Sequence, residues 1–125
     1  MMYKLSVESE FSAAHKLVEY PGACHRIHGH NWRVRIRVTA EKLDNLGMAV
    51  DLMMLKGLLD ECVQQFDHQM INEIAPFDRI NPSSENLAKY FFEWLEKRLP
   101  PVVTLEQVTL SETEQFSVTY RGSLK

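Results

Sequence analysis

Apolar and charged residues alternate strictly along residues 32–38. Every second residue there is apolar, and arginines stand between them: Trp32, Val34, Ile36 and Val38 against Arg33, Arg35 and Arg37. A period of two predicts a strand with one buried face, which we place over residues 30–41. The first residues share this pattern at Tyr3, Leu5, Val7, Phe11 and Ala13. They predict a strand over residues 2–14, antiparallel to the other, unless a bulge at Ser9 breaks its register.

The middle of the chain changes to helical spacing. A first helix is expected to begin at the N-cap Asp51 and to end near residues 65–67. Its apolar stripe comprises Leu52, Leu55, Leu59, Cys62 and Phe66. A second helix should follow the N-cap Ser83, with Glu85 in its first turn, and stop at Pro100-Pro101. Its stripe comprises Leu87, Phe91, Trp94 and Leu95. Residues 67–81 between the helices are predicted to be irregular.

Two further strands, joined by a turn at residues 113–115, close the chain. Val108, Leu110 and Glu112 share one face of the first, and Phe116, Val118 and Tyr120 share one face of the second. The order is therefore ββααββ, an α+β fold in which two helices cover one face of an antiparallel four-stranded sheet. Such a sheet has two free edges, and its other face is polar. Both features favour edge-to-edge assembly into a homo-oligomer.

Length and composition predict one globular domain over residues 1–125. The net charge of −3 argues against nucleic acid or an anionic membrane as a main partner. No apolar run approaches the roughly 20 residues that span a bilayer. The N-terminus lacks the apolar core of a signal peptide, so we expect a cytoplasmic protein. In that compartment a disulfide between Cys24 and Cys62 is not expected, and Cys62 is interpreted as a packing residue.

Three histidines point to a metal site. His28 and His30 have the parity of Trp32, so both imidazoles would lie on the buried face if the strand extends back that far. His15 has the buried parity of the first strand. Any one of them could be an ordinary core or surface histidine. Together, three neutral nitrogen ligands with no evident fourth predict zinc in an open, catalytic site.

Further residues could carry chemistry, each with a simpler alternative. Cys24 could be a base or nucleophile whose thiolate zinc favours, or a small buried residue. Asp67-His68 could be a proton relay, a helix C-terminal cap or a surface pair. Glu112 could bind a guanidine-like edge of a heterocycle or stand at the solvent rim.

Six segments together resemble the 6-pyruvoyl- and 6-carboxy-tetrahydropterin synthase family. They span nearly the whole chain in the family's order: Phe11–His15, Cys24–His30, Gly47–Leu52, Leu58–His68, Asn81–Ala88 and Ser111–Thr113. The resemblance implies a tunnelling fold whose sheets join into a barrel, usually as trimers stacked into hexamers. It also implies zinc ligands at His15, His28 and His30, and a catalytic cysteine at Cys24. By the same resemblance, Asp67 and His68 form the catalytic pair, and Glu112 anchors the pterin. Ser83 stands where the family usually has Thr.

The spacing Cys24-x₃-His28-Gly29-His30 resembles that of family members acting in the queuosine pathway. This implies a zinc-dependent lyase that converts 7,8-dihydroneopterin triphosphate to 6-carboxy-5,6,7,8-tetrahydropterin, releasing acetaldehyde and triphosphate. Lys16 and Arg26 are candidates for binding the triphosphate. Two alternatives stay open: the pyruvoyl synthase reaction, which eliminates triphosphate alone, and a zinc- or pterin-binding subunit without turnover. A pure binder would have no need of a thiolate, which argues against the latter.

Overall fold

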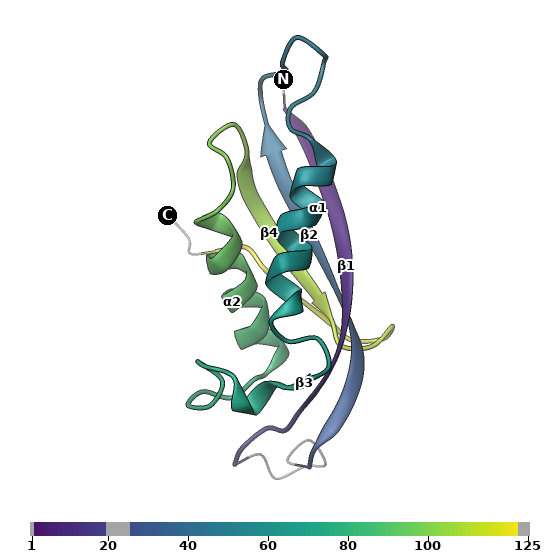
Figure 1. Cartoon of the computed structure of the whole chain (residues 1–125), viewed down its shortest axis with the longest axis vertical. Coiled ribbons are helices and arrows are strands. Elements are labelled where there is room, and N and C mark those ends of the chain that lie inside the picture. The colour runs from purple at the N-terminus through teal and green to yellow at the C-terminus, as the bar shows by residue number, and fades with distance from the viewer. Residues whose placement is uncertain (1, 20–25, 123–125) are drawn as a thin grey trace.

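The computed structural model describes residues 2–19 and 26–122. Two helices lie on one face of a sheet with strand order β3-β1-β2-β4-β5 (Figure 1). The strands are β1 (Tyr3–His15), β2 (His28–Ala40), β3 (Gln69–Met70), β4 (Thr104–Ser111) and β5 (Ser117–Tyr120). The helices are α1 (Leu52–Gln64) and α2 (Ser84–Glu96), and a short 3₁₀ helix, η2, covers Ile71–Glu73. The predicted α+β fold is confirmed.

The sheet has one strand more than predicted. β3 runs parallel to β1, pairing Gln69 with Ala13 and Met70 with Ala14. The prediction of a four-stranded, wholly antiparallel sheet is therefore wrong on this point. A strand of two residues is too short to show alternation, so its segment looked irregular in the sequence.

β1 and β2 pair along their whole length without a break. Their register runs from Tyr3 opposite Ala40 to His15 opposite His28. Ser9 keeps this register without a bulge, and its buried hydroxyl donates to Asp60 Oδ1 at 2.7 Å. The buried parity therefore continues unbroken from the core to His15.

The core lies between the sheet and the two helices. Phe11 stacks on Trp32 with ring centroids 5.8 Å apart, and the edge of Phe91 meets Phe11 at 5.8 Å. Cys62 is buried there as a free thiol, and burial raises its pKa to about 12. The predicted packing role of Cys62 is therefore confirmed.

The predicted stripe of α1 is wrong at its first residue. Leu52 is 47% exposed, whereas Leu55, Leu59 and Cys62 are fully buried. Helical side chains lean toward the N-terminus, so a residue in the first turn extends past the end of the helix. Leu52 instead lines an apolar surface hollow of about 480 Å³.

The face of the sheet away from the helices is charged. Arg33 pairs with Glu10 across the strands at 3.3 Å, and Arg35 pairs with Glu8 at 3.0 Å. Glu106 forms ion pairs with both Lys4 and Arg37, at 3.3 and 3.7 Å. Side chains this exposed contribute little stability, but they make the face unsuitable for packing in a dry core.

Four chain segments meet at the lower end of the molecule in Figure 1. β1 ends and β2 begins at the tip, and β4 ends and α2 begins somewhat above it. This end of the sheet lies beyond the hydrophobic core and holds the predicted metal ligands. None of the helices within the described residues is long and apolar enough to cross a membrane.

Candidate metal centre

His15, His28 and His30 come together at this end of the sheet. His15 is the last residue of β1 and lies opposite His28, the first residue of β2. The ring centroids are 4.5 Å apart for His15 and His28, and 4.9 Å apart for His28 and His30. Because alternate residues share a face, the unbroken register carries all three imidazoles to the helix-covered side.

Backbone carbonyls set which ring nitrogen of two histidines faces the cluster. His15 Nδ1 lies 2.7 Å from the carbonyl oxygen of Pro82, and His28 Nδ1 lies 2.8 Å from that of Arg26. A carbonyl only accepts, so Nδ1 is the donor in both contacts, and in the neutral ring the lone pair is then on Nε2. Metal-binding histidines commonly have this outer hydrogen bond, which fixes the ring and the tautomer.

Glu112, just beyond β4, directs its carboxylate into the same cluster. Its Oε1 lies 2.7 Å from His30 Nε2, 3.4 Å from His15 Nε2 and 3.8 Å from His28 Nε2. Its Oε2 accepts from the hydroxyl of Ser84, in the first turn of α2, at 3.4 Å. One ligand atom from each of the four residues lies within 4.8 Å of the others.

Burial favours the neutral form of two histidines in this cluster. Burial is the main cause that lowers the pKa of both His15 and His30, so the neutral, metal-ligating form is favoured. Their Nε2 atoms are buried, and neither makes a hydrogen bond of acceptable geometry. Nitrogen lone pairs and a carboxylate that converge on one point are stabilised by a cation between them. The four residues could therefore hold a metal ion.

Trp32 closes the inner side of the cluster. Its ring meets those of His15 and His30 edge to face, at 4.9 and 5.3 Å. Its indole N–H donates to the carbonyl of Ala13 at 3.1 Å, which fixes the ring plane. The indole of Trp32 is thus an apolar wall between the imidazoles and the core.

Comparison with known proteins places the chain in a family. The family model described as "6-pyruvoyl tetrahydropterin synthase" matches residues 4–123. The chain belongs to this family.

Individual relatives carry different activity names. A Synechocystis sp. protein named 6-carboxy-5,6,7,8-tetrahydropterin synthase is 34% identical, over 90% of this chain and 88% of its own length. A Pyrococcus furiosus protein named dihydroneopterin monophosphate aldolase is 31% identical, over 94% of this chain and 96% of its own length. The solved structure of Caenorhabditis elegans 6-pyruvoyl tetrahydropterin synthase superposes with a TM-score of 0.84 at 29% identity, covering 98% and 97% of the two chains.

In this member of the pterin synthase family the Asp-His pair is not one of the four clustered residues, although His68 lines the same surface hollow as His30. Asp67 and His68 follow α1, and Asp67 Oδ1 accepts from the backbone N–H of Ser12 at 2.9 Å. That hydrogen bond is the main cause that lowers the pKa of Asp67. His68 Nδ1 lies 3.0 Å from Asp67 Oδ1, and the His68 side chain is 80% exposed. The pair forms as expected, but it faces solvent at the β1 edge.

The remaining predicted residues of this chain are not part of the cluster, and two of them lie outside the described residues. Cys24 and His25 lie outside the described residues. Lys16 lines a surface cavity of about 620 Å³, and Arg26 is exposed and contributes its backbone carbonyl to His28. The sequence analysis did not identify the contact of the Pro82 carbonyl with His15, because every residue has a backbone carbonyl and side-chain patterns do not show which one is used.

Proposed function

We propose that the protein is a zinc-dependent carbon–carbon lyase. It converts 7,8-dihydroneopterin triphosphate to 6-carboxy-5,6,7,8-tetrahydropterin in queuosine biosynthesis, releasing acetaldehyde and triphosphate. The observation that carries the proposal is the convergence of one buried imidazole, that of His15, two partly buried ones, those of His28 and His30, and the carboxylate of Glu112. The name of the Synechocystis relative supports the choice of product.

Three nitrogen ligands and an accessible side suit zinc in a catalytic site. His15, His28 and His30 would hold the ion, with His15 and His28 oriented by backbone carbonyls. When bound, zinc supplies a Lewis acid that polarises hydroxyl oxygens of the substrate side chain. Although Glu112 lies within reach of the same ion, we assign its carboxylate to the donor groups of the pterin ring. The Ser84 hydroxyl beside it restricts the carboxylate.

Proton transfer is assigned to Cys24 and to the Asp67–His68 pair. Cys24 accepts a proton from the substrate, and His68 relays protons while Asp67 holds its imidazole. The hydrogen bond from the Ser12 N–H lowers the pKa of Asp67, which favours the ionised carboxylate that lies beside His68. These assignments rest on the family motifs together with the 3.0 Å contact of Asp67 and His68.

The proposal includes a homo-oligomer, a hexamer built as a dimer of trimers. β3 covers β1 only at Ala13 and Ala14, so most of this long edge has no strand neighbour within the described residues. β5 forms the other edge. The exposed His68 lies beside the β1 edge, so a sheet added there would bring His68 to a subunit contact.

The same fold supports a second reaction. In the pyruvoyl synthase reaction triphosphate is eliminated and the two-carbon fragment is kept. The close superposition on the Caenorhabditis elegans enzyme of that name favours this alternative. A non-catalytic pterin-binding subunit is the third possibility, and it differs by having no turnover.

Product identification by mass spectrometry separates these functions. The purified protein is incubated with dihydroneopterin triphosphate and, in parallel, with the monophosphate. The proposal predicts 6-carboxy-tetrahydropterin, acetaldehyde and triphosphate from the former. A pyruvoyl product would establish the alternative reaction. Turnover of the monophosphate alone would point to the activity named for the Pyrococcus relative, and no turnover of either substrate would leave only a binding role.

A further inference from the structure

The chain leaving His15 is held by two asparagine side chains instead of by a strand. β1 ends at His15, and Lys16 to Val18 continue beyond it without a strand partner. Asn72 Oδ1 accepts from Lys16 N–H at 2.9 Å, and Asn72 Nδ2 donates to the Lys16 carbonyl at 3.0 Å. Asn81 repeats this on Val18, with distances of 2.8 and 3.0 Å.

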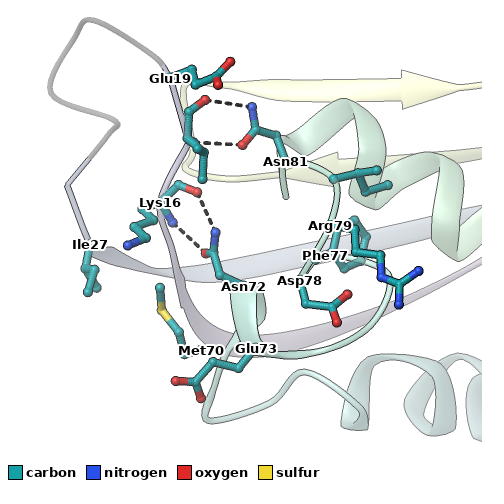
Figure 2. A pocket seen from close by; sticks show the side chains of 12 residues that line it. Lys16, Glu19, Ile27, Met70, Asn72, Glu73, Phe77, Asp78, Arg79 and Asn81 are labelled. Atoms are coloured by element: carbon teal, nitrogen blue, oxygen red, sulfur yellow. Dashed lines mark hydrogen bonds between the residues drawn. The ribbon is translucent and has the colours of Figure 1, made fainter.

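Each asparagine reproduces the hydrogen bonds of a strand neighbour. In an antiparallel pair one residue exchanges both N–H···O bonds with the residue opposite it. A carboxamide carries a donor and an acceptor side by side, so a single side chain can do the same. Lys16 and Val18 are two residues apart, and their backbone groups therefore point to the same side of an extended chain. Figure 2 shows the two amides reaching this one side.

The two asparagines come from separate, anchored elements. Asn72 belongs to η2, where the neighbouring Ile71 is fully buried. Asn81 precedes α2, and its carbonyl accepts from Asn86 Nδ2 at 2.9 Å. Both therefore reach the segment from places that the core and α2 hold in position.

The same anchored segment also holds the His15 ring. Asn81 grips Val18, and the next residue, Pro82, accepts the Nδ1–H of His15. The dipeptide Asn81-Pro82 therefore binds both the backbone of Val18 and the imidazole of His15. Asn72 binds the backbone of Lys16, which lies between His15 and Val18 in the chain. Without these contacts the backbone after His15 would be less constrained. The imidazole of His15 would then be held less firmly beside those of His28 and His30.

We infer that Asn72 and Asn81 are positioning residues for the proposed metal centre, which hold the backbone after His15 so that its Nε2 stays aimed at the cluster. The inference rests on the proposed metal centre but not on the identity of the reaction. Neither asparagine contacts the cluster itself, so both act through His15.

The first test uses metal-free protein and amide hydrogen exchange. Asn72→Ala should speed exchange at Lys16, and Asn81→Ala should speed it at Val18, each leaving the other amide protected. Asn72→Asp keeps the acceptor and should restore protection at Lys16. Unchanged exchange rates at Lys16 and Val18 in both alanine variants would overturn the inference that these asparagines hold the backbone after His15.

The second test measures zinc affinity by competition with a chromophoric chelator. Losing a direct outer partner of a metal ligand typically weakens binding by about 10- to 100-fold. The asparagines act one step further out, so a loss of about 10-fold, the lower end of that range, is expected for the Asn72→Ala/Asn81→Ala variant. Ser9→Ala is the matched control, because it removes a hydrogen bond from the same strand far from the cluster. Its zinc affinity should equal that of the unmodified protein.

Equal affinity in the double variant and the unmodified protein would overturn the inference, as would an equal loss in Ser9→Ala. Absence of zinc binding by the unmodified protein would overturn it together with the proposed centre. The titration uses no pterin, so failure of the proposed reaction appears separately, as zinc-loaded protein without turnover.

Discussion

At the scale of single residues, parity along two strands was enough to bring the histidines together. His15, His28 and His30 could be placed on one face because their strands alternate without interruption as far as these residues. The contacts that orient the rings could not be predicted. The carbonyls of Pro82 and Arg26 are backbone groups, available at every position, and only the folded chain selects them.

Cys24 and Glu112 are predicted to fail in different ways when each is replaced by alanine. Cys24→Ala should keep zinc and bind the pterin, but lose turnover by about 10²- to 10⁴-fold, as for loss of a general acid–base group. Glu112→Ala should keep zinc and bind the pterin weakly, because the ring's donors lose a charged acceptor. Substrate titration without turnover compares the two. Equally poor binding by both variants, with metal lost from Cys24→Ala, would make Cys24 a zinc ligand.

The buried histidines predict a pH-dependent stability of the metal-free protein. Burial holds the pKa of His15 and His30 below the ordinary value of 6.5. Below that pH the unfolded chain binds protons that the folded chain does not, so stability falls as the pH is lowered. The urea midpoint should therefore be lower at about pH 5.5 than at about pH 7.5. A His15→Gln/His30→Gln variant should show a flatter dependence, and an equally steep one would assign the effect to other groups.

At the scale of elements, long periodic segments were predictable and short ones were not. Both helix starts follow their sequence signals: the side chain of Asp51 accepts from Met53 N–H, and that of Ser83 accepts from Asn86 N–H. β3 escaped prediction because two residues carry no period. The contacts of Asn72 and Asn81 with the backbone after His15 could not be predicted, because single side chains that bind a backbone leave no periodic pattern in the sequence.

The two N-caps make a matched pair of variants. Asp51→Ala and Ser83→Ala should each lower the free energy of unfolding by about 1 kcal/mol, the usual effect of losing a cap. Only Ser83 adjoins Pro82, whose carbonyl holds the His15 ring. Ser83→Ala alone should therefore weaken zinc binding, measured by chelator competition. Equal zinc affinity in the two variants would show that the start of α2 does not position the site.

At the scale of the whole molecule, the sheet has a charged outer face, and within the described residues only a short part of its β1 edge has a strand neighbour. β1 is thirteen residues long, and β3 covers two of them. The cross-strand ion pairs of Arg33 and Arg35 keep the outer face hydrated. The alternation in the sequence predicted the polar face. It could not predict whether the β1 edge of one subunit pairs with the β5 edge of another, because that depends on partner chains.

Light scattering tests assembly. A ring-like homo-oligomer should show no stable monomer at micromolar concentration, because the edges bury their backbone groups only when paired. Raising the salt concentration should leave the assembly intact, since backbone hydrogen bonds are screened less than exposed ion pairs. A monodisperse, active species of 14.5 kDa would contradict the proposal.

X-ray absorption at the zinc edge, on protein purified without added metal, tests the open three-histidine centre most directly. The prediction is one zinc per chain with nitrogen or oxygen neighbours at about 2.0–2.1 Å and no sulfur. His28→Ala should lose most of this zinc, whereas His68→Ala should keep it. A sulfur neighbour at about 2.3 Å would make Cys24 a fourth ligand and the centre closed and structural. Full activity in protein without zinc would contradict the metal centre altogether.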